Sequence, residues 1–214
     1  MARACFITLE GGEGVGKTTN LDFIQEYLAD HGVDVLRTRE PGGTPLGEEI
    51  RHLLLNSESM DSYAELLLVF SSRAQHVNTL IKPALTVGRW VLCDRFTDAS
   101  YAYQGGGRQL DGKVIGFLEQ WVQDGLQPDL TLLLDAPVEV GMARAKQRKQ
   151  SDRFELEVPV FFEQVRRAYL ERAAQYPERI KIIDAAQPLD AVQADIARHL
   201  DSLLERTQYE HSSL

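Results

Sequence analysis

A glycine-rich segment near the N-terminus has the residue types and spacing of a phosphate-binding loop. Its glycines let backbone N–H groups turn toward phosphate oxygens, and the helix that follows would add the partial positive charge of its N-terminus. Its lysine can reach the β- and γ-phosphates, while the next hydroxyl can complete a Mg²⁺ shell. We therefore expect a bound nucleoside triphosphate. The segment fits G-x-x-x-x-G-K followed by Ser or Thr, and it reads Gly11-Gly12-Glu13-Gly14-Val15-Gly16-Lys17-Thr18.

A second charged motif, Asp94-Arg95, ends a later apolar run. A motor ATPase would be expected to end that run in paired acids, and a guanine-selective switch would carry Asn-Lys-x-Asp, which this sequence does not contain. An arginine at the carboxyl edge of a parallel sheet is well placed for a second anionic substrate. The motif therefore favours a kinase that binds two anions, with a structural salt bridge of Asp94 as the alternative.

The elements that must position these residues follow from five short aliphatic runs. Each run is almost continuously apolar, which is typical of strands buried on both faces of a parallel sheet. Longer amphipathic stretches separate them, so we predict an α/β fold with right-handed crossover helices. Strands are predicted at residues 5–10, 33–38, 90–94, 130–135 and 180–184, and helices from near Lys17, Pro45, Ser62, Leu110, Val138, Pro159 and Pro188.

Two segments break this regular pattern and are candidate ligand loops. Residues 104–108 are glycine-rich, and residues 144–155 are densely charged. A solvated surface is the ordinary interpretation of such a charge run. We nevertheless keep it as a candidate ligand loop, because an anionic ligand of this acidic chain must be held by locally placed cations.

The composition is that of a globular protein and limits the classes of partner. The chain has 214 residues, 43% of them hydrophobic and 26% charged, so we expect one domain over residues 1–214. Its net charge of -9 disfavours a nucleic-acid surface. No run approaches the roughly 18 apolar residues that would cross a membrane, and no signal peptide is apparent. Cys5 and Cys93 lie in apolar runs, which favours reduced thiols and a cytoplasmic location.

Six segments together carry a resemblance to a known family. They are residues 9–19 (LEGGEGVGKTT), 38–44 (TREPGGT), 94–96 (DRF), 102–108 (AYQGGGR), 128–131 (PDLT) and 152–155 (DRFE). In this order and spacing they resemble the bacterial thymidylate kinase family over nearly the whole chain. The resemblance implies a three-layer P-loop NTPase fold with a five-stranded parallel sheet, a lid at about 144–155 and a homodimer. It also implies that ATP and Mg²⁺ are used to phosphorylate dTMP to dTDP.

By that resemblance, cations from two parts of the chain neutralise the transferred phosphoryl group. Lys17 and Arg95 act from the phosphate loop and the third strand. Some family members carry a catalytic arginine in the phosphate loop, where this chain has Gly14, so Arg148 and Arg153 of the lid are implied to supply that charge. The residues implied to hold ATP are Gly11, Gly12, Glu13, Gly14, Val15, Gly16, Lys17, Thr18, Thr19, Arg144 and Arg148, with Thr18 reaching Mg²⁺ together with the nucleotide phosphates.

The resemblance places the acceptor dTMP against a second set of residues. Arg73 is implied to donate to O4 of thymine, which cytosine replaces with an amino group. Its stacking neighbour is Val69 or Phe70, and Phe70 is equally suited to the core. Glu13 is implied to approach the sugar 3′-hydroxyl, although a carboxylate exposed to solvent is the alternative. The complete acceptor set is Glu13, Arg39, Glu40, Pro41, Arg51, Val69, Phe70, Arg73, Arg95, Ser100, Tyr103 and Gln104, of which Arg39 and Arg51 also suit a solvated surface.

Two other functions remain open at this point. The chain could phosphorylate another small acceptor, such as CMP, AMP or shikimate, on the same sheet. It could also be a nucleotide-dependent switch or assembly ATPase that transfers phosphate only to water.

Overall fold

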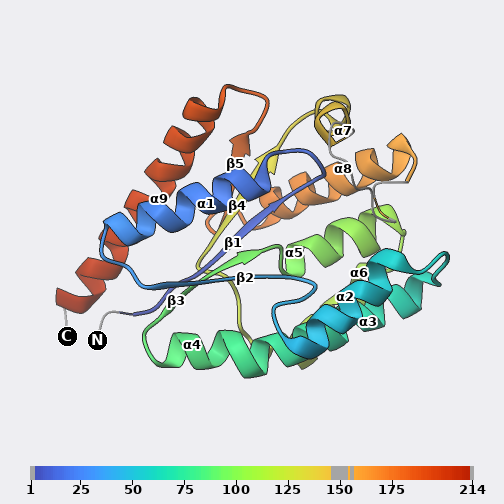
Figure 1. Ribbon diagram of the computed structural model, residues 1–214, viewed down its shortest axis with the longest axis horizontal. Coiled ribbons are helices and arrows are strands. Elements are labelled where there is room, and N and C mark those ends of the chain that lie inside the picture. Colours follow the sequence, from blue (N-terminus) through green and yellow to red (C-terminus); the bar gives the residue numbers. More distant parts are fainter. Residues whose placement is uncertain (1–2, 146–153, 155–156, 213–214) are drawn as a thin grey trace.

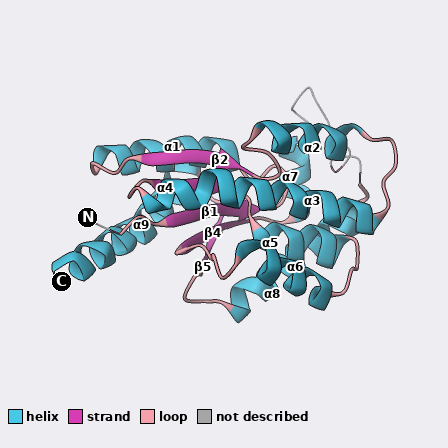
Figure 2. Cartoon of the chain, turned by 90° about the horizontal axis from the view of Figure 1, so that it is seen from below, coloured by secondary structure: helices cyan, strands magenta, loops and turns pink. Residues whose placement is uncertain are grey.

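The computed structural model describes residues 3–145, 154 and 157–212 of the chain. Its centre is a five-stranded parallel sheet in the order β2-β3-β1-β4-β5, with helices on both sides (Figure 1; Figure 2). The first strand along the chain, β1, therefore lies in the middle of the sheet. The loop that follows it lies between the loops that follow β3 and β4, at the edge where ligands bind in such folds. The strands are β1 (Phe6–Gly11), β2 (Val35–Arg39), β3 (Trp90–Asp94), β4 (Leu130–Asp135) and β5 (Ile180–Asp184).

The predicted strands agree closely with the observed ones. β3, β4 and β5 have the predicted bounds, whereas β1 begins and ends one residue later and β2 begins two residues later and ends one later than expected. Every residue of β1 is buried, as a central strand covered on both faces requires. The parallel α/β fold predicted from the apolar runs is confirmed.

The two helices that follow β2 begin at capping side chains. Thr44 accepts from the N–H of Gly47, and Asp61 accepts from those of Tyr63 and Ala64, which fixes the starts of the two helices that follow β2. The helical elements are α1 (Lys17–Asp30), α2 (Pro45–Asn56), α3 (Ser62–His76), η1 (Val77–Ile81), α4 (Lys82–Thr86), α5 (Thr97–Ser100), η2 (Tyr101–Gly107), α6 (Gly112–Gln123), α7 (Val138–Ala145), α8 (Pro159–Gln175) and α9 (Leu189–Ser212). None of the helices that the structure describes is both long and apolar enough to span a membrane.

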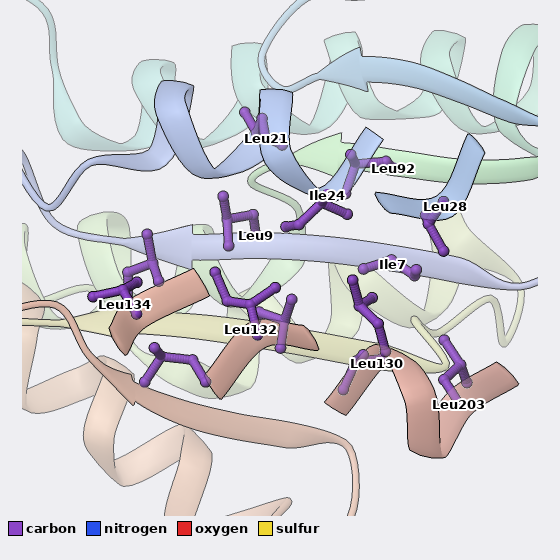
Figure 3. Packing of buried hydrophobic residues seen from close by; sticks show 14 of the residues in the cluster. Ile7, Leu9, Leu21, Ile24, Leu28, Leu92, Leu130, Leu132, Leu134 and Leu203 are labelled. Atoms are coloured by element: carbon purple, nitrogen blue, oxygen red, sulfur yellow. The ribbon is translucent and has the colours of Figure 1, made fainter. Parts of the chain in front are cut away.

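The largest core cluster lies between the sheet and the α1 and α9 helices. Leu21 and Ile24 of α1, Ile7 and Leu9 of β1 and Leu203 of α9 belong to this cluster, and Ile24 lies between its helix and β1 (Figure 3). Alternate residues of the strands face the opposite side of the sheet, where η1, α4, η2 and α8 cover them. The sheet is thus held from both sides, and its carboxyl edge is a rigid base for the loops that follow β1, β2 and β3.

The glycine-rich segment 104–108, predicted to be a ligand loop, is helical through Gly107 instead. It forms most of η2, which packs on α8. A Cβ at Gly106 would lie 2.7 Å from that of Ala168, and one at Gly107 would lie 2.4 Å from the ring of Phe161. These glycines are therefore needed for the close approach of two helices and not for a flexible loop.

Candidate active site

The phosphate loop connects the buried strand β1 to α1, as predicted. Gly11, Gly14 and Gly16 have φ of 140°, 71° and 90°, which side chains other than glycine rarely adopt. Lys17 lies on the first turn of α1, and its ammonium donates to the carbonyl oxygens of Gly11 at 3.4 Å and Gly12 at 3.1 Å. The loop thus turns around the lysine nitrogen in front of the helix N-terminus, the arrangement that binds phosphate.

Gly14 has a second constraint besides its backbone angle. A Cβ at this position would lie 1.9 Å from the carbonyl oxygen of Gly141 in α7. Gly141 is equally restricted, because a Cβ there would lie 2.3 Å from the carbonyl oxygen of Glu13. The phosphate loop and α7 therefore touch backbone to backbone.

Glu13, Arg95 and Tyr103 form a hydrogen-bonded cluster beside the loop. Arg95 donates through Nη2 to Glu13 Oε1 at 2.6 Å, to Tyr103 Oη at 2.7 Å and to the carbonyl of Gly11 at 3.3 Å. Tyr103 also donates to Glu13 at 2.8 Å. Burial alone would raise the pKa of Glu13, but the charges of Arg95 and Lys17 outweigh it and hold that pKa well below its usual range. Glu13 is therefore an ionised, paired carboxylate and not a solvated one.

An open cleft on one side of this cluster is lined by several cationic side chains. Its buried polar atoms include Asp94 Oδ1 and Arg95 Nε, for which the described part of the chain supplies no hydrogen-bond partner. Arg39, at the end of β2, is half-exposed and pairs with Glu48 at 2.7 Å. The cleft is lined by Glu13, Gly14, Val15, Gly16, Lys17, Thr18, Thr19, Arg39, Arg51, Asp94, Arg95 and Arg144.

A second cavity lies on the other side of the same cluster. It contains most of the residues predicted to hold the acceptor, drawn from the loop after β2, from α2, α3 and α5 and from η2. Phe70 does not line it, because its ring packs with Leu66 and Ile115 in the core while Val69 faces the cavity. The lining residues are Glu13, Glu40, Pro41, Arg51, Leu54, Leu55, Val69, Arg73, Arg95, Phe96, Ala99, Ser100, Tyr103, Gln104 and Phe154.

Arg73 is fixed in the wall of this second cavity by three hydrogen bonds. It donates from Nε to Glu40 at 2.7 Å, from Nη1 to Ser100 at 3.0 Å and from Nη2 to the carbonyl of Phe96 at 3.1 Å. The other oxygen of Glu40 bonds the ring of His76 at 2.8 Å. With both side chains of the ion pair no more than 2% exposed, the guanidinium has a defined orientation.

Gln104 is also held by a residue behind the cavity wall. Its Nε2 donates to Oε1 of Glu65 at 2.8 Å, and Glu65 also accepts from Arg108. The sequence interpretation missed both Glu65 and His76. A signal was present, because Glu65, Val69 and Arg73 are spaced four residues apart on α3 and so share one helix face.

A buried carboxylate lies beneath the site at the end of β1. Glu10 accepts from the N–H of Phe96 at 2.7 Å and from the hydroxyl of Tyr169 at 2.8 Å. Burial, followed by the nearby charge of Asp98, raises the pKa of Glu10 to about 8. This carboxyl group therefore supports the backbone after β3 in a largely protonated form at neutral pH.

The predicted lid is described only at its two ends. Arg144 donates to the carbonyl of Ala185 at 2.9 Å, and the ring of Phe154 lies 5.7 Å from that of Tyr103. Arg148 and Arg153 lie outside the described residues. Within the described ranges, no group of three or more His, Cys, Asp or Glu side chains is placed to hold a metal ion.

Comparisons with known proteins give a consistent result. A family model described as thymidylate kinase matches residues 9–196. The chain is 60% identical over 203 residues to a thymidylate kinase of Pseudomonas putida, covering 94% of this chain and 97% of that one. It is 56% identical over 199 residues to a thymidylate kinase of Methylococcus capsulatus, with 93% and 96% covered. The crystal structure of thymidylate kinase from Ehrlichia chaffeensis superposes with a TM-score of 0.76 at 34% identity, covering 92% of this chain and 98% of that chain.

Proposed function

The chain belongs to the thymidylate kinase family, and from that premise we propose how its residues carry out phosphoryl transfer to dTMP. The family makes it a nucleoside monophosphate kinase, a phosphotransferase. One observation carries the assignment of roles: the cation-lined cleft and the second cavity share Glu13, Arg51 and Arg95. A donor phosphate in the cleft and an acceptor phosphate in the cavity would meet at these residues, as direct transfer requires.

We propose that the cleft binds the triphosphate of ATP with Mg²⁺. The backbone of residues 11–18 surrounds the phosphates, and Lys17 neutralises the β- and γ-phosphates. The fit of Mg²⁺ is supported by the exposed Thr18 and by Oδ1 of Asp94, to which no described residue donates, in the same cleft. Bound there, the ion would neutralise phosphate charge. Arg144 is proposed to lie on the nucleotide side.

Arg95 and the cations of the lid are proposed to neutralise the negative charge of the transferred phosphoryl group. Arg95 lies between the two cavities, where Glu13 and Tyr103 fix it. Arg39 lines the cleft and is proposed to exchange its exposed partner Glu48 for acceptor phosphate. The proposal that Arg148 and Arg153 complete the site rests on the sequence.

The second cavity is proposed to bind the thymine and deoxyribose of dTMP. Arg73 donates to O4, Val69 lies under the ring, and Gln104 faces the N3 edge. Tyr103, held to Glu13, packs beside the sugar and leaves little room for a 2′-hydroxyl. Glu40, Pro41, Arg51 and Ser100 complete the wall, whereas the buried Phe70 supports Arg73 from behind at 4.6 Å between ring centroid and guanidinium carbon.

An ADP-release assay across several acceptors tests the function. We expect turnover with dTMP, slower turnover with dUMP because one methyl group contributes only about 1 to 3 kcal/mol, and little with CMP, UMP or AMP. A preference for CMP or AMP would contradict thymidylate as the acceptor. Steady ADP release without any acceptor would instead indicate a switch or assembly ATPase.

We also propose a homodimer formed through α3 and α6. Three apolar side chains are exposed on these helices: Leu67 at 56%, Phe117 at 68% and Trp121 at 75%. A patch of this kind on a highly charged chain suits a self-complementary two-fold interface. Sedimentation should give a dimer that Trp121→Glu converts to monomer, whereas Val87→Glu, on an exposed residue elsewhere, should leave it unchanged.

A cytoplasmic location is proposed from the cysteines. Cys5 and Cys93 both lie buried in the apolar core, and Cys93 is a free thiol, which suits a reducing compartment.

A further inference from the structure

Glu65 is a buried acid that contacts the acceptor cavity only through other side chains. It lies on α3, and its side chain is 0% exposed. One oxygen accepts from Gln104 Nε2 at 2.8 Å, and Arg108 Nε lies 3.3 and 3.2 Å from its two oxygens. Glu65 therefore connects a cavity residue on η2 to a cation outside the cavity.

This contact determines which way the amide of Gln104 points. A glutamine amide has an acceptor oxygen and a donor nitrogen of nearly the same shape, so its neighbours decide the orientation. A carboxylate paired with a guanidinium offers only acceptors, so the nitrogen of Gln104 must face Glu65. The oxygen then remains for the cavity, and none of the described residues donates a hydrogen bond to it.

The orientation matters because pyrimidine bases differ at the same edge. Thymine presents N3–H, a donor, between two carbonyl oxygens, whereas cytosine presents a bare N3 acceptor beside an amino group. An amide that offers its oxygen accepts from N3–H of thymine. The reversed amide would present its nitrogen to the cavity instead, and would donate to N3 of cytosine.

We propose that Glu65 is a positioning residue that sets selectivity for the thymine edge by preventing the amide of Gln104 from reversing. The proposal rests on the function proposed above. It adds to the choice made by Arg73, whose donors oppose the cytosine amino group, and it assigns the N3 edge to Glu65 acting through Gln104.

Arg108 keeps Glu65 in this role. Its guanidinium carbon lies 4.7 Å from the ring centroid of Phe161 and 5.7 Å from that of Phe154, and Nη1 donates to Glu157 at 2.5 Å. Glu157 and the two rings therefore hold the guanidinium beside the oxygens of Glu65.

The substitution Glu65→Gln tests the proposal, because an amide at this position can either donate or accept. Steady-state kcat/KM is measured for dTMP, dUMP and dCMP. We expect the dTMP-to-dCMP ratio to fall roughly tenfold, mainly through a higher KM for dTMP, since a reversed amide opposes two donors at N3. The dTMP-to-dUMP ratio should stay at the wild-type value, because both bases present the same N3–H and carbonyl groups.

Glu157→Gln is the matched control. It also removes a carboxylate from Arg108, but among the described residues no hydrogen bond joins Glu157 to Gln104, so both ratios should stay unchanged. The double variant Glu65→Gln, Gln104→Glu exchanges the amide and the carboxylate and should restore the dTMP-to-dCMP ratio. Thermal unfolding of each variant shows whether it is folded. If Glu65→Gln does not fold, the dTMP-to-dCMP ratio of the double variant still tests the proposal.

Two outcomes would overturn the proposal. One is an unchanged dTMP-to-dCMP ratio in folded Glu65→Gln. The other is an equal loss of discrimination against dUMP, which would indicate a loosened cavity and not a reversed amide. Failure of the wild-type protein to phosphorylate dTMP would contradict the proposed function separately, before any variant is compared.

Discussion

The phosphate cleft and the acceptor cavity share three residues, yet their charged groups are held differently. In the cavity wall, Arg73 and Glu40 form an ion pair whose side chains are 1% and 2% exposed. At the cleft, Arg39 and Glu48 form a pair of similar length whose side chains are 50% and 42% exposed. The same chemical pair therefore occurs once in a low-dielectric wall and once in contact with solvent.

This difference suits the two ligands. A neutral base is recognised by donors and acceptors in fixed directions, and buried pairs such as Arg73 with Glu40 supply fixed directions. A polyphosphate is recognised by charge, and exposed cations such as Arg39 can turn toward it with little loss of existing interactions. Under the proposed assignment of ligands, selectivity lies in the cavity, while the cleft supplies positive potential.

The largest effect should come from breaking the buried pair. Arg73→Leu leaves Glu40 buried without its guanidinium, so the free energy of unfolding should fall by about 3 to 5 kcal/mol. Arg39→Leu, the matched change at the exposed pair, should cost less than about 1 kcal/mol. Urea unfolding followed by tryptophan fluorescence measures both, and equal losses would remove the distinction between the two regions.

On the cleft side, removal of Lys17 should affect catalysis without affecting the fold. Lys17→Met removes the cation of the phosphate loop, and we expect kcat to fall about 10³-fold. The exposed Lys113→Met serves as the control and should retain full activity. Kinetics and melting temperature should be measured together, since a comparable fall in stability would assign Lys17 to the fold.

Arg153→Ala tests whether the cleft needs cations from the lid. We expect kcat to fall about 10²-fold with a modest change in KM for ATP, because the charge is required in the transition state. Arg148→Ala should be measured in parallel to divide the role between the two arginines. An unaltered kcat in both variants would mean that the described cations of the cleft are sufficient.

The smallest effect concerns the pH dependence of stability. Glu10 has a folded-state pKa raised to about 8 from 4.5, so its contribution to stability is present below the unfolded value and is lost as pH rises through 8. Between about pH 6 and pH 8 the free energy of unfolding should fall by about 1 to 2 kcal/mol more in the wild type than in Glu10→Gln. Glu13 has the opposite sign: its lowered pKa gives stability above 4.5 that is lost as pH falls. Unfolding curves of the wild type and of Glu10→Gln between pH 6 and pH 8 measure this difference in stability. Parallel pH profiles of the two proteins would contradict the role of Glu10.

Much of the fold could be predicted because its signals are local. A continuous apolar run indicates a strand covered on both faces, and residues 90–94, 130–135 and 180–184 were assigned without error. Many of the residues that line the two cavities were named from the sequence because they follow strand ends or lie within recognisable motifs, whereas Leu54, Leu55 and Ala99 of the second cavity were not named.

What could not be predicted depends on packing between distant segments. The glycines at 106 and 107 indicated a loop, whereas their partners Ala168 and Phe161 lie on a helix some sixty residues later. The sequence left open whether Phe70 faces the core or the ligand, because the answer depends on α6, which packs against its ring. Glu65 was not singled out, because its contacts with Gln104 and Arg108 join α3 to residues some forty positions later.

The contact between Gly14 and Gly141 restricts the evolutionary routes open to this chain. An arginine at position 14 would place a cation in the phosphate loop itself, but its Cβ would lie 1.9 Å from a backbone carbonyl of α7. A substitution at this codon alone therefore creates a clash, and α7 would have to move first. Under the role proposed for the lid, the two placements of a catalytic arginine are separated by epistasis, and a chain with this contact must keep its cations elsewhere.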